Sequence, residues 1–191
     1  MHNAGYNCLS TQAVVTAAWW PQRERFLARV RHHLDKAWLR TPYYPGAAER
    51  AAAFRAAYPD QAEVLGAKCD EADGCALRPT LIAGLDAAAR ARDSRCCTQE
   101  VWSAVLTEMP LETGEESVPA FLEAAARFCN EELWGDLNAW MIIHPAEQAY
   151  RLRVRVRVRV RGRGRGRGRA RILVRVGVRI SLTLTLTLTL T

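Results

Sequence analysis

From residue 151 onward the sequence becomes a succession of dipeptide repeats, and this feature confines an ordinary globular fold to residues 1–150. Arginine alternates with leucine or valine over 151–161 and with glycine over 161–169, whereas leucine alternates with threonine over 181–191. Low-complexity stretches of this kind lack the varied apolar side chains from which a packed core is built. The uncharged Leu–Thr run is also prone to β-structure. We therefore predict a folded body followed by a separate repeat tail.

The two parts differ in charge. The tail, residues 151–191, contains thirteen arginines and no acidic residue, whereas the body contains 14 basic residues and all 20 acidic ones. The body is therefore net acidic although the whole chain is +7. Three interpretations of the tail stay open: a translated DNA repeat without function, a disordered segment that binds RNA, or a cationic strand on an anionic membrane. We favour the first, because folded domains rarely contain such segments.

The cysteines and histidines do not have the spacing of a metal site. None of the six cysteines forms a Cys-x-x-Cys pair, and the chain has only four histidines. We predict no metal ligand, since Cys69 and Cys75 lie in an acidic stretch without further ligands. The first residues lack the pattern of a signal peptide, and no apolar run is long enough for a transmembrane helix. We expect reduced thiols and a cytoplasmic protein.

The body alternates strand-like and helix-like segments, which is typical of an α/β fold. Short apolar or β-branched runs predict strands, and apolar residues at helical spacing or an alanine-rich run predict helices. We expect parallel pairing of the strands, with helices flanking the sheet. The predicted strands cover residues 12–16, 79–85, 101–109 and 137–143, and the predicted helices cover residues 21–34, 47–58 and 118–133.

A segment near the start has residues suited to presenting a nucleophile. It reads Asn-Ala-Gly-Tyr-Asn-Cys, so that Asn3, Gly5 and Cys8 are spaced as Asn-x-Gly-x-x-Cys. Glycine permits a tight backbone turn. A cysteine placed just before a strand would face a cleft, with its own N–H available to an oxyanion. The segment resembles the Asn-x-Gly-Gln-x-Cys around the nucleophile of aldehyde dehydrogenases, although Tyr6 stands where glutamine is usual.

A second segment strengthens this resemblance. Residues 99–105 read Gln-Glu-Val-Trp-Ser-Ala-Val, which is similar to the Glu-Glu-x-Phe-Gly-Pro-Val of the same family. The resemblance implies that Glu100 binds a ribose of the nicotinamide cofactor and that Trp102 lies beside the nicotinamide. The first Glu of the family motif is Gln99 here, and its Gly-Pro is replaced by Ser-Ala. A third stretch, residues 121–135, resembles the helix and Tyr-Gly-Leu segment that follow in the family.

Taken over residues 3–145, the resemblance implies that the body, residues 1–150, is part of an aldehyde dehydrogenase catalytic domain. It implies that the Cys8 thiolate attacks an aldehyde, that hydride passes to NAD or NADP, and that water releases the acid from a thioester. Homo-oligomers are common in this family. The body contains no glycine-rich phosphate loop and no counterpart of the family's general base, so we expect the isolated chain to be inactive.

Other interpretations of these residues stay open. Cys8 could be an incidental buried thiol, Glu100 a surface acid at a strand end, and Trp102 a core aromatic. The chain could also be a non-catalytic remnant whose arginine-rich tail binds nucleic acid. We expect the sulfur of Cys8 to face Glu100 and Trp102 across a cleft, and a position on the opposite side of the sheet would argue against the dehydrogenase resemblance.

Overall fold

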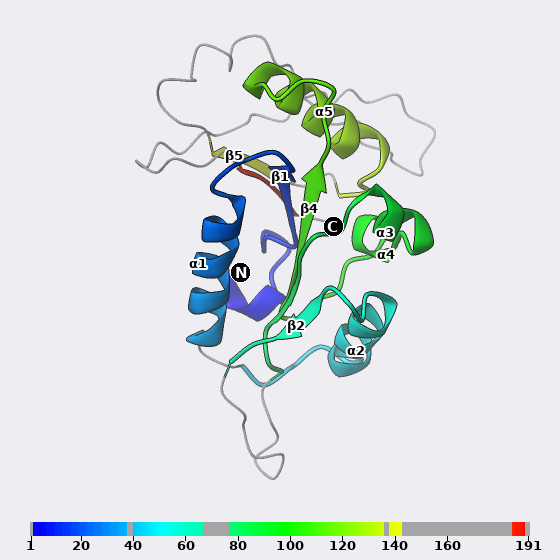
Figure 1. The fold of residues 1–191 in the computed structure, drawn as a ribbon. Coiled ribbons are helices and arrows are strands. Elements are labelled where there is room, and N and C mark those ends of the chain that lie inside the picture. The colour runs from blue at the N-terminus through cyan, green and yellow to red at the C-terminus, as the bar shows by residue number, and fades with distance from the viewer. Residues whose placement is uncertain (1, 38–39, 67–76, 136–137, 143–184, 190–191) are drawn as a thin grey trace, which may run out of the picture.

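The computed structural model describes residues 2–37, 40–66, 77–135, 138–142 and 185–189 (Figure 1). The predicted loop that contains Cys69 and Cys75 lies outside the described residues, as does the arginine-rich part of the tail. The described segments form a mixed α/β structure with one six-stranded sheet in the order β2-β3-β4-β1-β6-β5. The predicted α/β class is therefore confirmed.

Three neighbouring strands in this sheet are parallel, as the sequence predicts. They are β3 (Thr80–Ile82), β4 (Val105–Leu111) and β1 (Ala13–Ala17), and Val15 lies opposite Met109 in the register of β1 and β4. Every residue of β1 is buried, which fits a continuous Ala-Val-Val-Thr-Ala run in a strand covered on both faces.

The remaining strands pair antiparallel, so the expectation of a wholly parallel sheet is wrong. β2 (Ala62–Val64) adds to β3 at one edge, β6 (Thr185–Thr189) pairs with β1, and β5 (Asn138–Ile142) pairs with β6. Of these, β5 corresponds to the predicted strand 137–143, whereas β6 falls in the Leu–Thr run of the tail. Antiparallel strands at the ends of a parallel sheet are common in α/β proteins.

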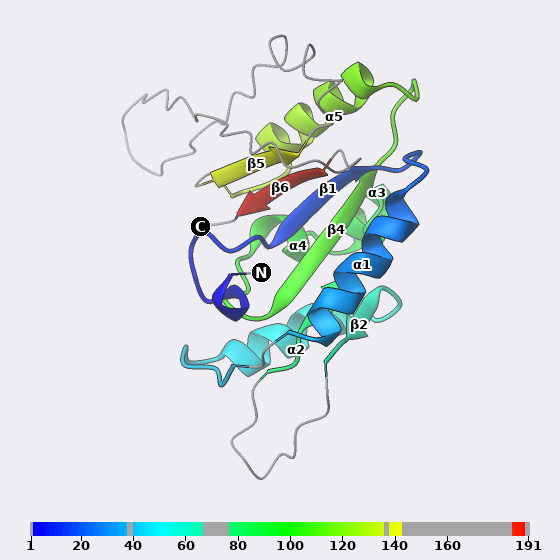
Figure 2. The ribbon, with the colours of Figure 1, turned by 90° about the vertical axis from the view of Figure 1, so that its left-hand side faces the viewer.

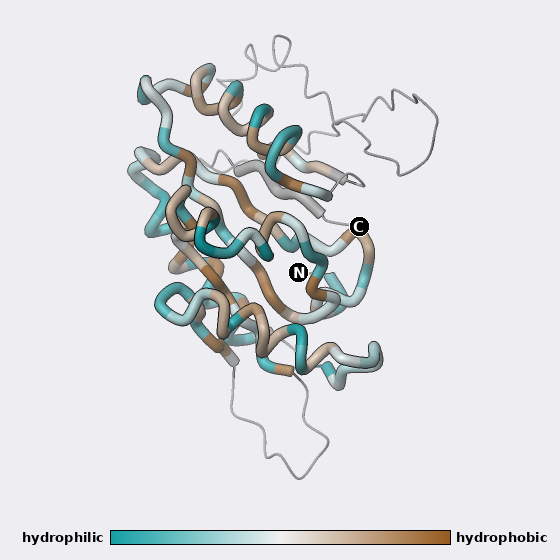
Figure 3. Tube along the Cα trace, turned by 90° about the vertical axis from the view of Figure 1, so that its right-hand side faces the viewer, coloured by the Kyte–Doolittle hydropathy of each residue, from teal (hydrophilic) through white to brown (hydrophobic). Residues whose placement is uncertain are grey.

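Helices cover both faces of the sheet (Figures 1 and 2). One face packs against α1 (Arg23–Asp35), whose Leu34 joins Val14, Leu81 and Leu106 in a small apolar cluster. The other face packs against α2, α3, α4 and α5, and Figure 3 views the molecule from the side on which the first three lie. The bounds of these helices are Ala47–Ala57, Ala87–Arg92, Arg95–Thr98 and Val118–Glu131.

The larger core lies on this second face, since alternate residues of each strand point to opposite faces of a sheet. Val15, Ile82 and Met109 are fully buried there, and Phe121 and Phe128 of α5 pack into the same cluster. The helix α5 begins at Val118, as predicted, and the side chain of Ser117 before it accepts a hydrogen bond from the N–H of Ala120 at 3.4 Å. No helix in the described segments is both long and apolar enough to cross a bilayer.

Candidate functional site

The Asn-x-Gly-x-x-Cys segment forms a tight turn whose backbone is mostly left-handed. Asn3, Ala4 and Gly5 have φ values of 50°, 51° and 83°, and residues 3–5 make a single 3₁₀ turn, η1. Such conformations are uncommon for residues with a side chain and cluster at functional sites. Gly5 is required for a second reason, because a Cβ built there would lie 1.9 Å from the carbonyl oxygen of Ser103. The turn therefore packs directly on the backbone of the second motif segment.

Side-chain hydrogen bonds hold the turn closed. Asn3 donates from Nδ2 to Oδ1 of Asn7 at 2.7 Å and to the hydroxyl of Tyr43 at 2.8 Å. Ser10, which is fully buried, accepts from the N–H of His2 at 3.1 Å and donates to its carbonyl at 2.7 Å. These hydrogen bonds fix the residues on both sides of Cys8 and thereby hold its backbone in place.

Cys8 is the exposed thiol among the cysteines that the structure describes. Burial raises the pKa of the Cys129 thiol in α5 above its usual range. Cys96 and Cys97 are buried in α4 with their sulfurs 3.6 Å apart, and a hydrogen bond between them lowers the pKa of Cys96 and raises that of Cys97. Among these four cysteines, exposure therefore singles out Cys8 as the thiol that a solute can reach.

The second motif segment is a buried loop and not the start of a strand. The strand predicted from residue 101 begins only at Val105, because Glu100–Ala104 form a loop that precedes β4. Trp102 has a φ of 46°, a conformation that bulky residues rarely adopt. Arg50 of α2 supports the loop by donating from Nε to the carbonyl of Val101 at 2.8 Å. The two positions matched to cofactor contacts therefore lie on a loop held by another helix.

An aromatic group joins the two motif segments. The ring centroid of Tyr6 lies 4.7 Å from that of Tyr43 and 5.8 Å from that of Tyr44, and the Tyr44 ring lies 5.3 Å from that of Trp102. Tyr6 is buried, and burial raises its pKa, whereas Tyr43 and Tyr44 are about half exposed. Tilted rings at these separations attract one another. Tyr6 is thus part of the packing between the segments.

Glu100 is partly buried beside these aromatics. Its Oε1 accepts a hydrogen bond from Nε2 of Gln12 at 3.1 Å. Burial raises the pKa of Glu100 to about 7, and hydrogen bonds from Gln12 and Trp102 oppose that increase. A carboxyl that changes protonation near neutral pH can accept a hydrogen bond or release a proton under physiological conditions. Carboxyls with a pKa shifted in this way are frequent at functional sites.

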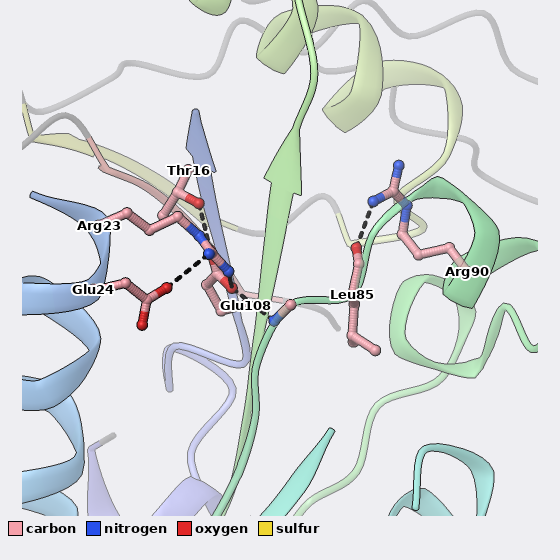
Figure 4. Close-up of polar contacts among 7 residues, drawn as sticks. Thr16, Arg23, Glu24, Leu85, Arg90 and Glu108 are labelled. Carbon is pink, nitrogen blue, oxygen red and sulfur yellow. Dashed lines mark hydrogen bonds and ion pairs between the residues drawn. The ribbon is translucent and has the colours of Figure 1, made fainter. Parts of the chain in front are cut away.

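The structure also reveals a buried carboxylate that the sequence interpretation missed. Glu108 lies in the middle of β4 and is 1% exposed (Figure 4). Arg23 of α1 donates to both of its oxygens, from Nε at 2.9 Å and from Nη2 at 2.7 Å. The hydroxyl of Thr16 and the N–H of Gly84 donate to it as well. A glutamate inside an apolar strand pattern is the sequence signal that could have drawn attention to it.

A cavity of about 840 Å³ lies next to the motif turn. One side of the cavity is lined by Asn3, Ala4 and Tyr43. Another side is lined by Leu34 of α1 and by Ala37, which follows this helix, and the wall continues to the residues that precede β3 and β4. Cys8, Glu100 and Trp102 are not among the described residues that line it. The cavity therefore borders the candidate site without containing the residues predicted to perform its chemistry.

The structure brings the two motif segments together, although they are about ninety residues apart in the chain. Gly5 and Gln12, which flank Cys8 on both sides, contact the second segment directly. Tyr6 is connected to Trp102 through the ring of Tyr44. The direction in which the sulfur of Cys8 faces relative to Glu100 and Trp102 stays a prediction. Within the described segments, no three His, Cys, Asp or Glu side chains gather as a metal site requires.

Comparison with known proteins supports the fold. No protein-family model matches the sequence, and no curated protein is significantly similar to it. The fold is similar to that of a solved structure from Anabaena variabilis, named Putative Aldehyde Dehydrogenase PutA, with a TM-score of 0.51 and 18% sequence identity. The similarity covers 79% of this chain and 31% of that protein, so this chain corresponds to about a third of its length.

Proposed function

We propose that the body of this chain is part of the catalytic domain of an aldehyde dehydrogenase, with Cys8 as the nucleophile and Glu100 and Trp102 on the cofactor side. The packing of the motif turn on the Glu100–Ala104 loop carries this proposal. Aldehyde oxidation requires the nucleophile and the hydride acceptor to be held close to each other, and the packing of the turn on this loop supports such an arrangement. The fold similarity is consistent with it.

The proposed chemistry of Cys8 follows from its exposure. Its thiolate adds to the carbonyl carbon of an aldehyde, so that a carbon–sulfur bond forms, and the carbonyl oxygen takes up a proton to give a thiohemiacetal. A bound nicotinamide would supply the hydride acceptor for the oxidation. The aldehyde and the choice between NAD and NADP depend on residues beyond this part of such an enzyme.

The residues present fit one end of the cofactor. The Glu100 carboxylate is partly buried, accepts a hydrogen bond from Gln12 and is suited to accept another from a ribose hydroxyl. The half-buried Trp102 ring offers an apolar surface. The described residues offer no glycine-rich loop for the pyrophosphate. We accordingly propose that the chain recognises the nicotinamide ribose weakly and does not turn over aldehyde by itself.

An alkylation experiment tests the nucleophile. An aldehyde should slow the reaction of Cys8 with iodoacetamide at concentrations that leave a peptide of residues 3–12 unprotected, because only the folded turn stabilises the adduct. Mass spectrometry reads the modification of Cys8 and Cys129 in the same sample. Equal protection of the peptide and the protein would refute a role for Cys8.

A binding experiment tests the cofactor side. Nicotinamide mononucleotide contains the part of the cofactor that these residues fit, and saturation-transfer NMR detects weak binding. Glu100→Gln and Trp102→Ala should each reduce binding about fivefold, the loss expected from one hydrogen bond or ring contact of about 1 kcal/mol. Glu123→Gln, on the exposed surface of α5, is the matched control. Binding that is unaffected by either site variant would refute the assignment.

A further inference from the structure

Gln12 is a buried polar side chain to which neither motif assigns a role. It directly precedes β1 and is 3% exposed. Its backbone carbonyl accepts hydrogen bonds from the N–H of Thr107 at 2.8 Å and from the Thr107 hydroxyl at 2.9 Å. The β1–β4 pair therefore fixes its main chain. Burying an amide is costly unless its polar atoms are paired, so its partners matter.

Both ends of the Gln12 amide bind the loop that contains Glu100. Nε2 donates to Oε1 of Glu100 at 3.1 Å, and Oε1 of Gln12 accepts from the N–H of Val101 at 3.3 Å. The Val101 N–H can pair only with the amide oxygen, so the NH₂ group must face Glu100. Gln12 therefore offers Glu100 a donor and no acceptor, which favours the ionised carboxylate.

The other groups around Glu100 act in the same sense. Trp102 also donates a hydrogen bond that lowers the pKa of Glu100, against the effect of burial. The guanidinium of Arg50 donates to the carbonyls of Val101 and Pro45, each at 2.8 Å, so these donors are directed at backbone oxygens and not at the carboxylate of Glu100. Neutral donors, and not an ion pair, thus hold the carboxylate in place.

We propose that Gln12 is a positioning residue that orients Glu100 and keeps it available as a hydrogen-bond acceptor for a hydroxyl-bearing ligand. In assigning that ligand to the nicotinamide ribose, the inference rests on the function proposed above. The assignment of Gln12 itself rests on its burial and its two contacts to consecutive residues of the loop.

The titration of Glu100 tests this role in the full chain. Carboxyl carbons of ¹³C-labelled glutamate are followed by NMR as a function of pH, and the Glu100→Gln variant identifies the signal. Gln12→Met removes the donor with little change in shape and should raise the midpoint by about one pH unit. Gln12→Asn keeps an amide but is too short to reach both partners, and it should raise the midpoint by a smaller amount.

Gln99→Met is the matched control, because Gln99 is an exposed glutamine in the same loop. Its Glu100 midpoint should equal that of the unmodified chain. Unchanged midpoints in both Gln12 variants would overturn the inference, and the asparagine variant keeps the test decisive if the methionine variant does not fold.

Mononucleotide binding separates this inference from the proposed function. If the Gln12 variants raise the Glu100 midpoint but the unmodified chain does not bind nicotinamide mononucleotide, the positioning role stands and the cofactor assignment fails. If the mononucleotide binds and the midpoint does not depend on Gln12, the cofactor assignment stands and the positioning role fails.

Discussion

Replacing Arg23 by methionine is expected to destabilise the sheet strongly, because it removes the cation that balances Glu108. The carboxylate is 1% exposed, and Arg23 supplies two of its hydrogen bonds, at 2.9 and 2.7 Å. Methionine retains much of the side-chain volume, so the loss is mainly electrostatic. Removing one partner of a buried ion pair typically costs about 3–5 kcal/mol. The hydroxyl of Thr16 and the N–H of Gly84 would remain as uncharged donors, which favours the lower end of this range.

Urea unfolding at pH 7, followed by circular dichroism, measures this cost as a change in the free energy of unfolding. Arg25→Met is the matched control, since Arg25 is an exposed arginine of the same helix, and it should change stability by no more than about 0.5 kcal/mol. The double variant Arg23→Met with Glu108→Met should be more stable than Arg23→Met alone, because it leaves no unpaired charge. A cost below about 1 kcal/mol for Arg23→Met, or strictly additive losses, would refute this reasoning.

Three further outcomes are expected. Iodoacetamide should modify Cys8 at least about tenfold faster than buried Cys129 in the native protein, and equal rates by mass spectrometry would contradict the difference in exposure between the two thiols. Gly5→Ala should cost more than about 1 kcal/mol of unfolding free energy, since its φ is +83° and its site has no space, whereas Gly114→Ala has nothing within 4 Å and should be nearly neutral; similar losses would contradict the close contact. Because the folded state holds the Glu100 proton more tightly, wild-type stability relative to Glu100→Gln should fall as pH rises from about 4.5 to about 7, and a pH-independent difference in urea midpoints would contradict the raised pKa.

Local patterns predict the longer elements of this fold well. The helices α1, α2 and α5 and the strand β1 begin and end within a few residues of their predicted bounds. Each has a local signal of its own: apolar periodicity in α1 and α5, alanine content in α2 and a continuous apolar, β-branched run in β1. The short elements are missed for the opposite reason. β2 is three residues long and mostly exposed, and α3 follows an Asp86 cap without a distinct apolar stripe, so contacts elsewhere in the fold decide their structure.

The contacts of the candidate site could not be predicted from the sequence. The motif residues Cys8, Glu100 and Trp102 can be named from the sequence, whereas Gln12 gains its role only when β1 and β4 align it with a loop 88 residues away. Glu108 is similar, since its partner Arg23 is 85 residues distant. The Trp102 segment was expected in a strand because its apolar residues continue into β4, and its left-handed backbone has no signal in residue type.

The packing of Gly5 on Ser103 has a consequence for how the chain folds. A turn that depends on a partner nearly a hundred residues away has a high contact order, so it forms only after the intervening chain has collapsed and its loop entropy has been lost. We therefore expect the turn around Cys8 to become ordered late in folding. A mutation that slows the docking of β4 should delay this ordering without contacting the turn.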